Sequence, residues 1–214
     1  MNRRRIVTIL PIALIGFSSV LAQRQGSDKL VEKVKEEFAR NKGIFALAFR
    51  NTDSGEEILI NERESFHAAS TMKTPVMIEI FKQAKQGVFS ITDSIVIKNE
   101  FKSIVDGSSY ELNPSDDSEL SLYKIIGQKR TIYDVMYQMI IASSNLATNI
   151  LIEKVDAKKV MVTVRDMGAR DLMVLRGVED SKAFAKGLNN AVTAYDLMLL
   201  FDAIANGKAV SLKA

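Results

Sequence analysis

The central stretch of the sequence is Phe66-His-Ala-Ala-Ser-Thr-Met-Lys-Thr-Pro75, which precedes an apolar run. It contains Ser70 and Lys73, three residues apart. If a helix begins near Ser70, the two side chains lie on one face, about one turn apart. A serine hydroxyl is a weak nucleophile that needs a neighbouring base, and a lysine can be that base when burial or a nearby cation keeps it neutral. The pattern therefore indicates a nucleophilic serine at a helix start, where backbone amides favour a developing negative charge.

The same residues also have a plainer interpretation. Ser-x-x-Lys fixes only two positions and occurs by chance in many chains, with the serine as a helix N-cap and the lysine as a solvated side chain. His67 is the only histidine. It could be pictured as a base for Ser70, but so close before the helix start we expect it to have a structural or surface role. The rest of the chain has to decide between these interpretations.

Length and composition describe an ordinary globular protein. The 214 residues suit one domain or two small ones, and 47% of them are hydrophobic and 26% charged. A formal net charge of +3 gives no reason to expect a nucleic-acid binder. The chain has no cysteine, so neither a disulfide framework nor a lipid-modified cysteine is expected.

The N-terminus resembles an export signal. A basic segment, Arg3–Arg5, precedes an apolar stretch that ends in small residues. These small residues, the last of them Ala22, predict signal-peptidase cleavage before Gln23. An uncleaved membrane anchor is the alternative, and the proline and glycine inside the stretch disfavour it. We therefore predict a signal peptide over residues 1–22, a mature domain over residues 23–214 without stable membrane insertion, and a periplasmic or secreted bacterial protein.

Hydrophobic periodicity predicts an α+β fold. An amphipathic helix is expected over residues 28–42, followed by a hairpin of two strands at 44–49 and 57–60. Pro75 is tolerated only near a helix start, which supports a helix that begins near Ser70. This helix is expected to run to residue 86 and to stop at Gly87. The other predicted elements are a strand at 91–97, a polar loop at 101–121, and helices at 131–140, from 145, at 158–168 and at 193–206. We expect an α/β lobe over residues 23–68 and a mostly helical lobe over 69–214.

Two polar segments interrupt this pattern. Ser143-Ser144-Asn145 lies between two apolar helical stretches. These residues could cap the second helix, or could project a hydroxyl and an amide into a cleft. Asp116-Asp117 could suggest a metal, but no histidine or cysteine lies near it in the sequence, and we interpret the pair as part of a solvated loop. No metal or cofactor site is predicted.

Together these motifs resemble those of the class A serine β-lactamases and, more broadly, of the penicillin-recognising serine hydrolases. The resemblance rests on Ser70-x-x-Lys73, on Ser143-x-Asn145 further along, and on a loop with Glu179 that precedes a Thr-initiated helix. It implies the β-lactamase/transpeptidase-like α+β fold, in which an antiparallel sheet flanked by helices lies beside an all-helical lobe.

The resemblance also implies a role for each of these residues. Ser70 would attack the lactam carbonyl, and Lys73 would accept or relay its proton. Ser143 would protonate the departing lactam nitrogen. Asn145 would bind the substrate's side-chain amide and tether Lys73, and Glu179 would hold the water that hydrolyses the acyl-enzyme. The expected protein is a monomeric β-lactamase that acts on small-molecule β-lactams without a cofactor and so gives antibiotic resistance.

The sequence departs from the class A pattern in three places. Ser144 stands where class A enzymes have aspartate. Arg176-Gly-Val-Glu179 places the glutamate one residue further from the arginine than that pattern does, so a surface carboxylate or a salt bridge within the loop is the alternative for Glu179. No Lys-Thr-Gly follows residue 190. In the family that motif lies on the strand that supplies the second oxyanion amide.

The missing third motif leads to a further expectation and leaves two rival functions open. We expect a fragment of a longer protein, without the last strands and the closing helix, that has little activity by itself, because one oxyanion-hole donor contributes about 3–4 kcal/mol. One rival is a D,D-peptidase-like penicillin-binding protein that acts on peptidoglycan stem peptides. The other is a non-catalytic relative that keeps the fold for binding.

Overall fold

The computed structural model of the protein describes residues 28–210 and divides into two compact units, Met1–Phe45 and Ala46–Ala214. In the first unit, a helix covers residues 28–40. The rings of Phe38 and Phe45 stack with their centroids 5.0 Å apart, which gives this unit an apolar contact of its own. The helix ends two residues before the predicted end, and the predicted signal peptide at 1–22 lies outside the described residues.

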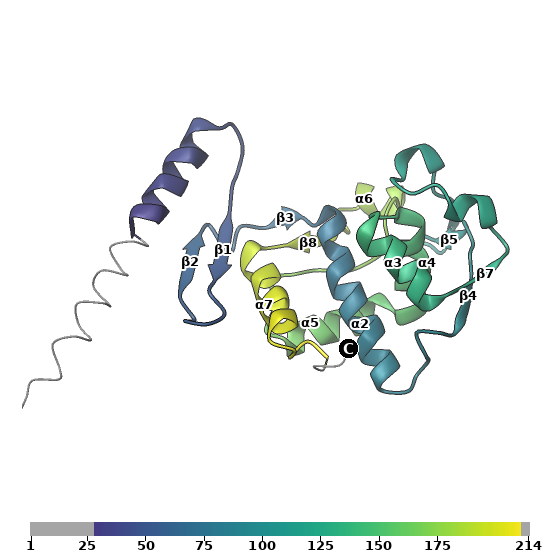
Figure 1. Cartoon of the computed structure of the whole chain (residues 1–214). Helices are drawn as coiled ribbons and strands as arrows, with labels where there is room; N and C mark the ends of the chain where they lie inside the picture. The colour runs from purple at the N-terminus through teal and green to yellow at the C-terminus, as the bar shows by residue number, and fades with distance from the viewer. Residues whose placement is uncertain (1–27, 211–214) are drawn as a thin grey trace, which may run out of the picture. The chain divides into compact units, whose positions relative to one another are not determined.

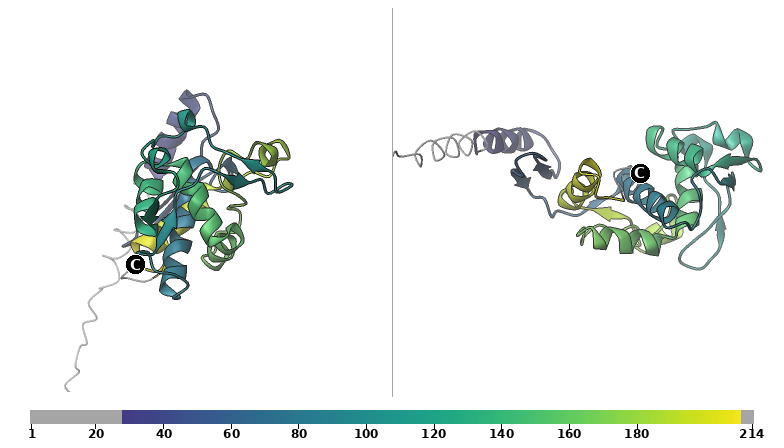
Figure 2. Two further views of the ribbon diagram at one scale, coloured as in Figure 1. Left: turned by 90° about the vertical axis from the view of Figure 1, so that its right-hand side faces the viewer. Right: turned by 60° about the horizontal axis from the view of Figure 1, so that its bottom comes forward.

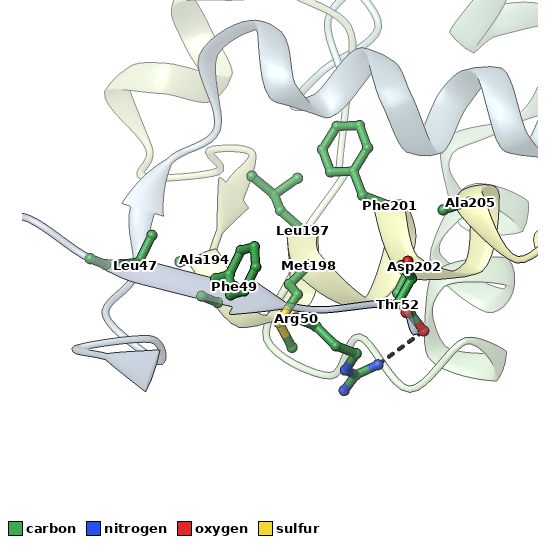
Figure 3. Close-up of a pocket in the computed structure, with 12 residues that line it drawn as sticks. Leu47, Phe49, Arg50, Thr52, Ala194, Leu197, Met198, Phe201, Asp202 and Ala205 are labelled. Carbon is green, nitrogen blue, oxygen red and sulfur yellow. Dashed lines mark hydrogen bonds and ion pairs between the residues drawn. The ribbon is translucent and has the colours of Figure 1, made fainter. Parts of the chain in front are cut away.

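The second unit begins with an antiparallel hairpin, β1 (Leu47–Arg50) and β2 (Glu57–Ile60). Alternate residues of β2 are buried, as expected for a strand with one face on the core. Helix α7 (Ala194–Ala205) packs against β1. Figure 3 shows Phe49 of β1 beside apolar side chains of α7, and a pocket between the two elements. At its edge, Arg50 forms an ion pair with Asp202 at 3.0 Å.

The segment that carries Ser70 is attached to a distant part of the chain. Strand β3 (Phe66–His67) pairs with β8 (Ala191–Val192) in antiparallel register. A short 3-10 helix, η1 (Ala69–Met72), follows and leads directly into α2 (Lys73–Lys85). The predicted helix is therefore present, but its first turn is 3-10 and the α-helix proper begins at Lys73.

Helices make up most of the regular secondary structure of the second unit. They are α3 (Ile132–Ile141), α4 (Asn145–Val155), α5 (Ala157–Asp166) and the short α6 (Ser181–Ala185), in addition to α2 and α7. Helix α2 contacts α3, α4 and α5, which can be followed in Figure 1 and from two further sides in Figure 2. The core lies where these helices meet, around the fully buried Val76, Ile80, Val135, Met139 and Leu151.

The chain from residue 91 to 131 is more ordered than its composition predicts. The predicted strand at 91–97 is reduced to β4 (Ser94–Val96), which pairs with β7 (Lys129–Thr131). The predicted polar loop contains the pair β5 (Phe101–Lys102) and β6 (Ser109–Tyr110). It also contains the 3-10 helix η2 (Pro114–Asp116), and a second 3-10 helix, η3 (Leu122–Ile125), follows directly after the loop. The prediction of a loop without regular structure was wrong, because β5 and β6 pair with each other within the segment despite its locally polar sequence.

The fold is α+β, as predicted. Within residues 28–210 the strands form four separate two-stranded antiparallel sheets. No helix in this described range is both long and apolar enough to cross a membrane.

Candidate active site

Ser70 lies at the start of η1, at the point where the chain leaves β3. The preceding residue, Ala69, has a positive φ of 44°. This left-handed conformation costs a non-glycine residue about 1 kcal/mol or more, so the surrounding structure must hold it. One such restraint is the backbone hydrogen bond from Ala68 to Asn190, at 2.9 Å. The turn leaves Ser70 exposed, in the second position of the helical turn, where a backbone amide has no partner within the helix.

Lys73 begins α2 one turn later and is buried, with only 3% of its surface exposed. Its Nζ lies within hydrogen-bond distance of four oxygen atoms. These are Ser70 Oγ at 3.1 Å, Ser143 O at 2.6 Å, Ser143 Oγ at 2.9 Å and Asn145 Oδ1 at 3.2 Å. Lys73 therefore connects the N-terminal end of α2 to the polar segment between α3 and α4.

The polar segment Ser143-Ser144-Asn145 has both of the roles that its sequence left open, since one residue caps α4 and another places its hydroxyl beside Ser70. Ser144 is buried and caps α4, because its Oγ accepts a hydrogen bond from the Ala147 amide at 3.1 Å. Ser143, with a φ of 57°, turns its hydroxyl the other way. Ser143 Oγ donates to Ser70 Oγ at 2.9 Å, so the two hydroxyls and the Lys73 amine form a closed triangle.

Burial sets the electrostatics of this triangle. Loss of hydration lowers the pKa of Lys73 below its usual value, while the negative charges of Asp117 and Glu179 act in the opposite direction. The net direction is downward. A larger fraction of the amine is therefore neutral near neutral pH than for an exposed lysine, which is the state a general base needs.

Glu179 lies in the loop between β-bridge residue Met173 and α6, and it faces Asn145 from across the site. Its Oε1 accepts a hydrogen bond from Asn145 Nδ2 at 2.9 Å. Partial burial raises the pKa of Glu179 above its usual value, although the hydrogen bonds from Asn145 and from the backbone of Asn113 oppose this. In the described part of the chain the side chain of Glu179 is hydrogen-bonded to Asn145, and its role stays a prediction.

Two side chains that the sequence did not single out hold this loop in place. Asn149 of α4 is buried, and its Oδ1 accepts from the Val178 amide at 2.6 Å while its Nδ2 donates to the Val178 carbonyl at 3.1 Å. A Cβ at Gly177 would lie 2.2 Å from Asn149 Oδ1, so only glycine fits beside this contact. Asp180 caps α6 and also accepts from Ser103 Oγ, at 2.9 Å. An asparagine inside a predicted helix and a glycine two residues before Glu179 were the only signals that the sequence offered for this contact.

Asp117 is not part of a solvated loop, and that prediction was wrong. Its side chain is only 9% exposed. Its carboxylate accepts hydrogen bonds from the backbone amides of Asn145, at 3.0 Å, and Leu146, at 2.8 Å. A buried charge needs such partners, and here they come from a helix that follows much later in the chain. Asp116, by contrast, is exposed.

A cavity of about 550 Å³ opens in front of these residues. Ser70, Asn145 and Glu179 line it, together with the exposed Phe184. His67 lies at this cavity too, and it is exposed on the strand that precedes Ser70. The space is large enough for a small organic molecule, and it is lined by the nucleophile candidate on one side and a carboxylate on the other.

Comparison with known proteins identifies the group to which this arrangement belongs. Residues 29–214 match the model of a family described as "Beta-lactamase enzyme family". The chain belongs to this family. No curated protein sequence matches it.

Several solved structures have a similar fold. A β-lactamase from Sphaerobacter thermophilus DSM 20745 is 27% identical, with a TM-score of 0.61 over 78% of this chain and 57% of that one. PBP-A is 21% identical, with a TM-score of 0.69 over 86% of this chain and 64% of that one. A β-lactamase from Chitinophaga pinensis DSM 2588, also 21% identical, has a TM-score of 0.71 over 85% of this chain and 64% of that one.

These matches confirm the predicted family and fold class. They place the chain in the serine hydrolase superfamily that contains β-lactamases and PBP-like proteins. The chain spans less than two thirds of the length of each of these three relatives.

Proposed function

We propose that this protein opens β-lactam rings through an acyl-enzyme formed on Ser70. The observation that carries the proposal is the triangle of Ser70 Oγ, Lys73 Nζ and Ser143 Oγ, with sides of 3.1, 2.9 and 2.9 Å. A nucleophile, a buried amine of lowered pKa and a second hydroxyl in mutual contact can move a proton in both directions during acyl transfer.

The contacts of Lys73 suit a neutral amine. A neutral amine has two N–H donors and one lone pair, whereas the ammonium has three donors. The Ser143 carbonyl and Asn145 Oδ1 can only accept, so they take the two N–H donors. The lone pair is then left for a hydroxyl proton. In the proposed first step, Lys73 takes the proton of Ser70 while Ser70 Oγ attacks the lactam carbonyl.

Ser143 would complete acylation. When the C–N bond of the ring breaks, the nitrogen needs a proton, and the Ser143 hydroxyl can give its own. Lys73 Nζ, 2.9 Å away, can then return to Ser143 the proton it took from Ser70. The products are an ester on Ser70 and a ring-opened amine, and the protonation states of Lys73 and Ser143 are restored.

Glu179 is the proposed base for release of the product. The Glu179 carboxylate accepts from Asn145 Nδ2, whereas Lys73 Nζ donates to Asn145 Oδ1. Glu179 lines the same cavity as Ser70. As a carboxylate it would take a proton from water while that water attacks the ester. When the ester C–O bond breaks, Ser70 Oγ takes a proton relayed through Ser143 Oγ and Lys73 Nζ, and Glu179 releases its proton to solvent, so that the free enzyme is restored. A mutant of PBP-A, a structural relative at 21% identity, is known as an acyl-enzyme complex with penicillin G, which supports a β-lactam as the reacting molecule.

Two further parts of the proposal concern the setting of the reaction. The basic and apolar N-terminal sequence favours export to the periplasm or the cell exterior. The small cavity favours a single β-lactam molecule as partner, and we propose that the protein acts as a monomer.

A penicillin-binding protein that remains acylated is the second candidate. Ser144, which replaces the aspartate of the class A motif, favours it. Glu179 disfavours it, because a carboxylate at this position gives the acyl-enzyme a route to hydrolysis.

Acylation and release, measured separately, test the proposal. The purified protein is incubated with a fluorescent penicillin and with a chromogenic cephalosporin. Because the sequence lacks Lys-Thr-Gly, we expect low rates for the 214-residue chain, so long incubations are needed. Label that appears and is then released supports a β-lactamase. Label that stays indicates a penicillin-binding protein, and absence of label contradicts both.

A further inference from the structure

Asp117 connects a distant loop to the part of the active site that contacts Lys73. It follows η2 directly, in a segment with no catalytic motif. Its two carboxylate oxygens accept hydrogen bonds from five donors. These are the amides of Asn145 (3.0 Å), Leu146 (2.8 Å) and Glu119 (3.1 Å), and the hydroxyls of Tyr123 (3.0 Å) and Ser144 (3.4 Å).

Two side chains, those of Asp117 and Ser144, together cap the first turn of α4. Asn145 and Leu146 are its first two residues, and their amides donate to Asp117. The third amide, of Ala147, donates to Ser144 Oγ, at 3.1 Å. A negative charge is favoured at this end of a helix, because the unpaired amides and the helix dipole both attract it. Asp117 supplies that charge from outside the helix.

The same segment also fixes the side chain of Asn145. Asn145 Nδ2 donates to the carbonyl of Asp116 at 3.3 Å, while the Asn145 backbone amide is bound by the Asp117 carboxylate. With both amide groups of Asn145 held, its Oδ1 faces Lys73 Nζ at 3.2 Å. A shift in the first turn of α4 would therefore change the contacts of Lys73 directly.

We propose that Asp117 is a positioning residue for the acylation step. It takes the place of an acidic side chain within the Ser143-Ser144-Asn145 motif, and it holds Asn145 against Lys73. This inference rests on the proposed function, because it assigns Asp117 to the acylation of Ser70.

The charge of Asp117 has a second consequence, which separates this role from simple support of α4. Asp117 and Glu179 are the two carboxylates whose charges raise the pKa of Lys73 against the effect of burial. Removal of one of them leaves burial less opposed, so the pKa of Lys73 falls further. If the neutral amine is the base, the acid limb of the acylation profile then moves to lower pH.

Four variants test the proposal, with acylation by fluorescent penicillin followed across pH. Asp117→Asn keeps the size of the side chain, but it loses the charge and presents an NH₂ group to donors. We expect it to acylate about tenfold or more slowly, with its acid limb at lower pH. Asp117→Ser alone should also be slow. Asp117→Ser combined with Ser144→Asp returns a carboxylate to the same helix end and should restore most of the rate. Asp134→Asn removes an exposed acidic residue from the first turn of α3 and serves as the matched control.

Hydrogen exchange provides a readout that needs no β-lactam. The Asn145 and Leu146 amides should exchange faster in Asp117→Asn than in the parent protein, while the later turns of α4 stay protected. If the parent protein is never acylated, the proposed function fails. Unchanged exchange at these two amides then overturns the role of Asp117 as well, and faster exchange supports its positioning of Asn145.

The remaining outcomes are equally distinct. The proposal is contradicted if Asp117→Asn acylates at the parental rate. It is also contradicted if Asp117→Asn acylates slowly but the acid limb of its pH profile does not move. If Asp117→Asn does not fold, the double variant decides, because it keeps a carboxylate at the N-terminus of α4. A folded double variant that acylates slowly overturns the proposal, and one that acylates near the parental rate supports it.

Discussion

Lys73 is the residue whose protonation state governs the proposed acylation. Its place beside Ser70 could be predicted from the sequence, since residues three apart share a helix face. Its contacts with Ser143 and Asn145 could be expected only through the resemblance to a known family. Its burial could not be predicted at all, because that depends on how α2 packs against α4.

The first prediction concerns the pH dependence of acylation. The rate should rise with pH as Lys73 loses its proton, and the midpoint should lie below the ordinary lysine value of about 10.4, because burial lowers the pKa. Lys73→Arg keeps a positive charge that cannot be removed, so we expect acylation to fall by about a thousandfold at every pH. Rates of labelling by fluorescent penicillin from acid to alkaline pH measure both effects. A Lys73→Arg protein with the parental profile would exclude Lys73 as the base.

The second prediction concerns Glu179 and product release. Glu179→Gln should still acylate, with its acid limb at lower pH because a negative charge near Lys73 is lost, but it should release product about a hundredfold or more slowly, because the amide cannot accept a proton from water. In the parent protein, release should slow as the pH falls through the pKa of Glu179. That decline should begin at a higher pH than for an ordinary glutamate, since burial raises the pKa. Glu111→Gln, at an exposed glutamate, is the matched control. Parental release by Glu179→Gln would remove the deacylation role.

Among the elements, α4 and the loop before α6 determine the geometry of the site. The helix itself was predictable from its apolar pattern, and its polar start marked a capping region. The double cap by Ser144 and Asp117 was not predictable, because one partner lies far away in the sequence. The loop conformation was equally hidden, since it depends on the contact between Asn149 and Val178.

The third prediction tests that loop contact. Gly177→Ala places a methyl group against Asn149 Oδ1 and should displace Val178 and Glu179. We expect release of product to slow by about tenfold or more, with a much smaller effect on acylation. Separate measurement of the two rates tests this expectation. In an Asn149→Ala background the contact is already lost, so Gly177→Ala should add little further effect. Equal slowing in both backgrounds would show that the contact is not the cause.

At the scale of the whole molecule, the sequence predicts helices better than strands. The helices carry apolar residues at regular spacing, and this pattern alone identifies α2, α3 and α7. The strand pairs are short, and some of them join distant segments, as β3 does with β8, so the pairing partner decides whether a strand forms. The α+β class was therefore predictable, whereas the order hidden in the segment from 101 to 121 was not.

The fourth prediction concerns the helical core that supports the site. Leu151 of α4 is fully buried, so Leu151→Ala should lower the free energy of unfolding by about 2–5 kcal/mol. Val162→Ala removes apolar atoms from an exposed position of α5 and should change it by less than about 0.5 kcal/mol. Urea unfolding followed by circular dichroism measures both. A Leu151→Ala protein as stable as Val162→Ala would contradict the placement of the core around α4.

Peptide mapping by mass spectrometry tests the central claim most directly. The Glu179→Gln protein is incubated with penicillin, digested and compared with a Ser70→Ala protein treated in the same way. We predict that one penicillin is bound covalently to Ser70 in the first protein, and that the second carries none. An adduct on another residue, or none on Ser70, would contradict the account.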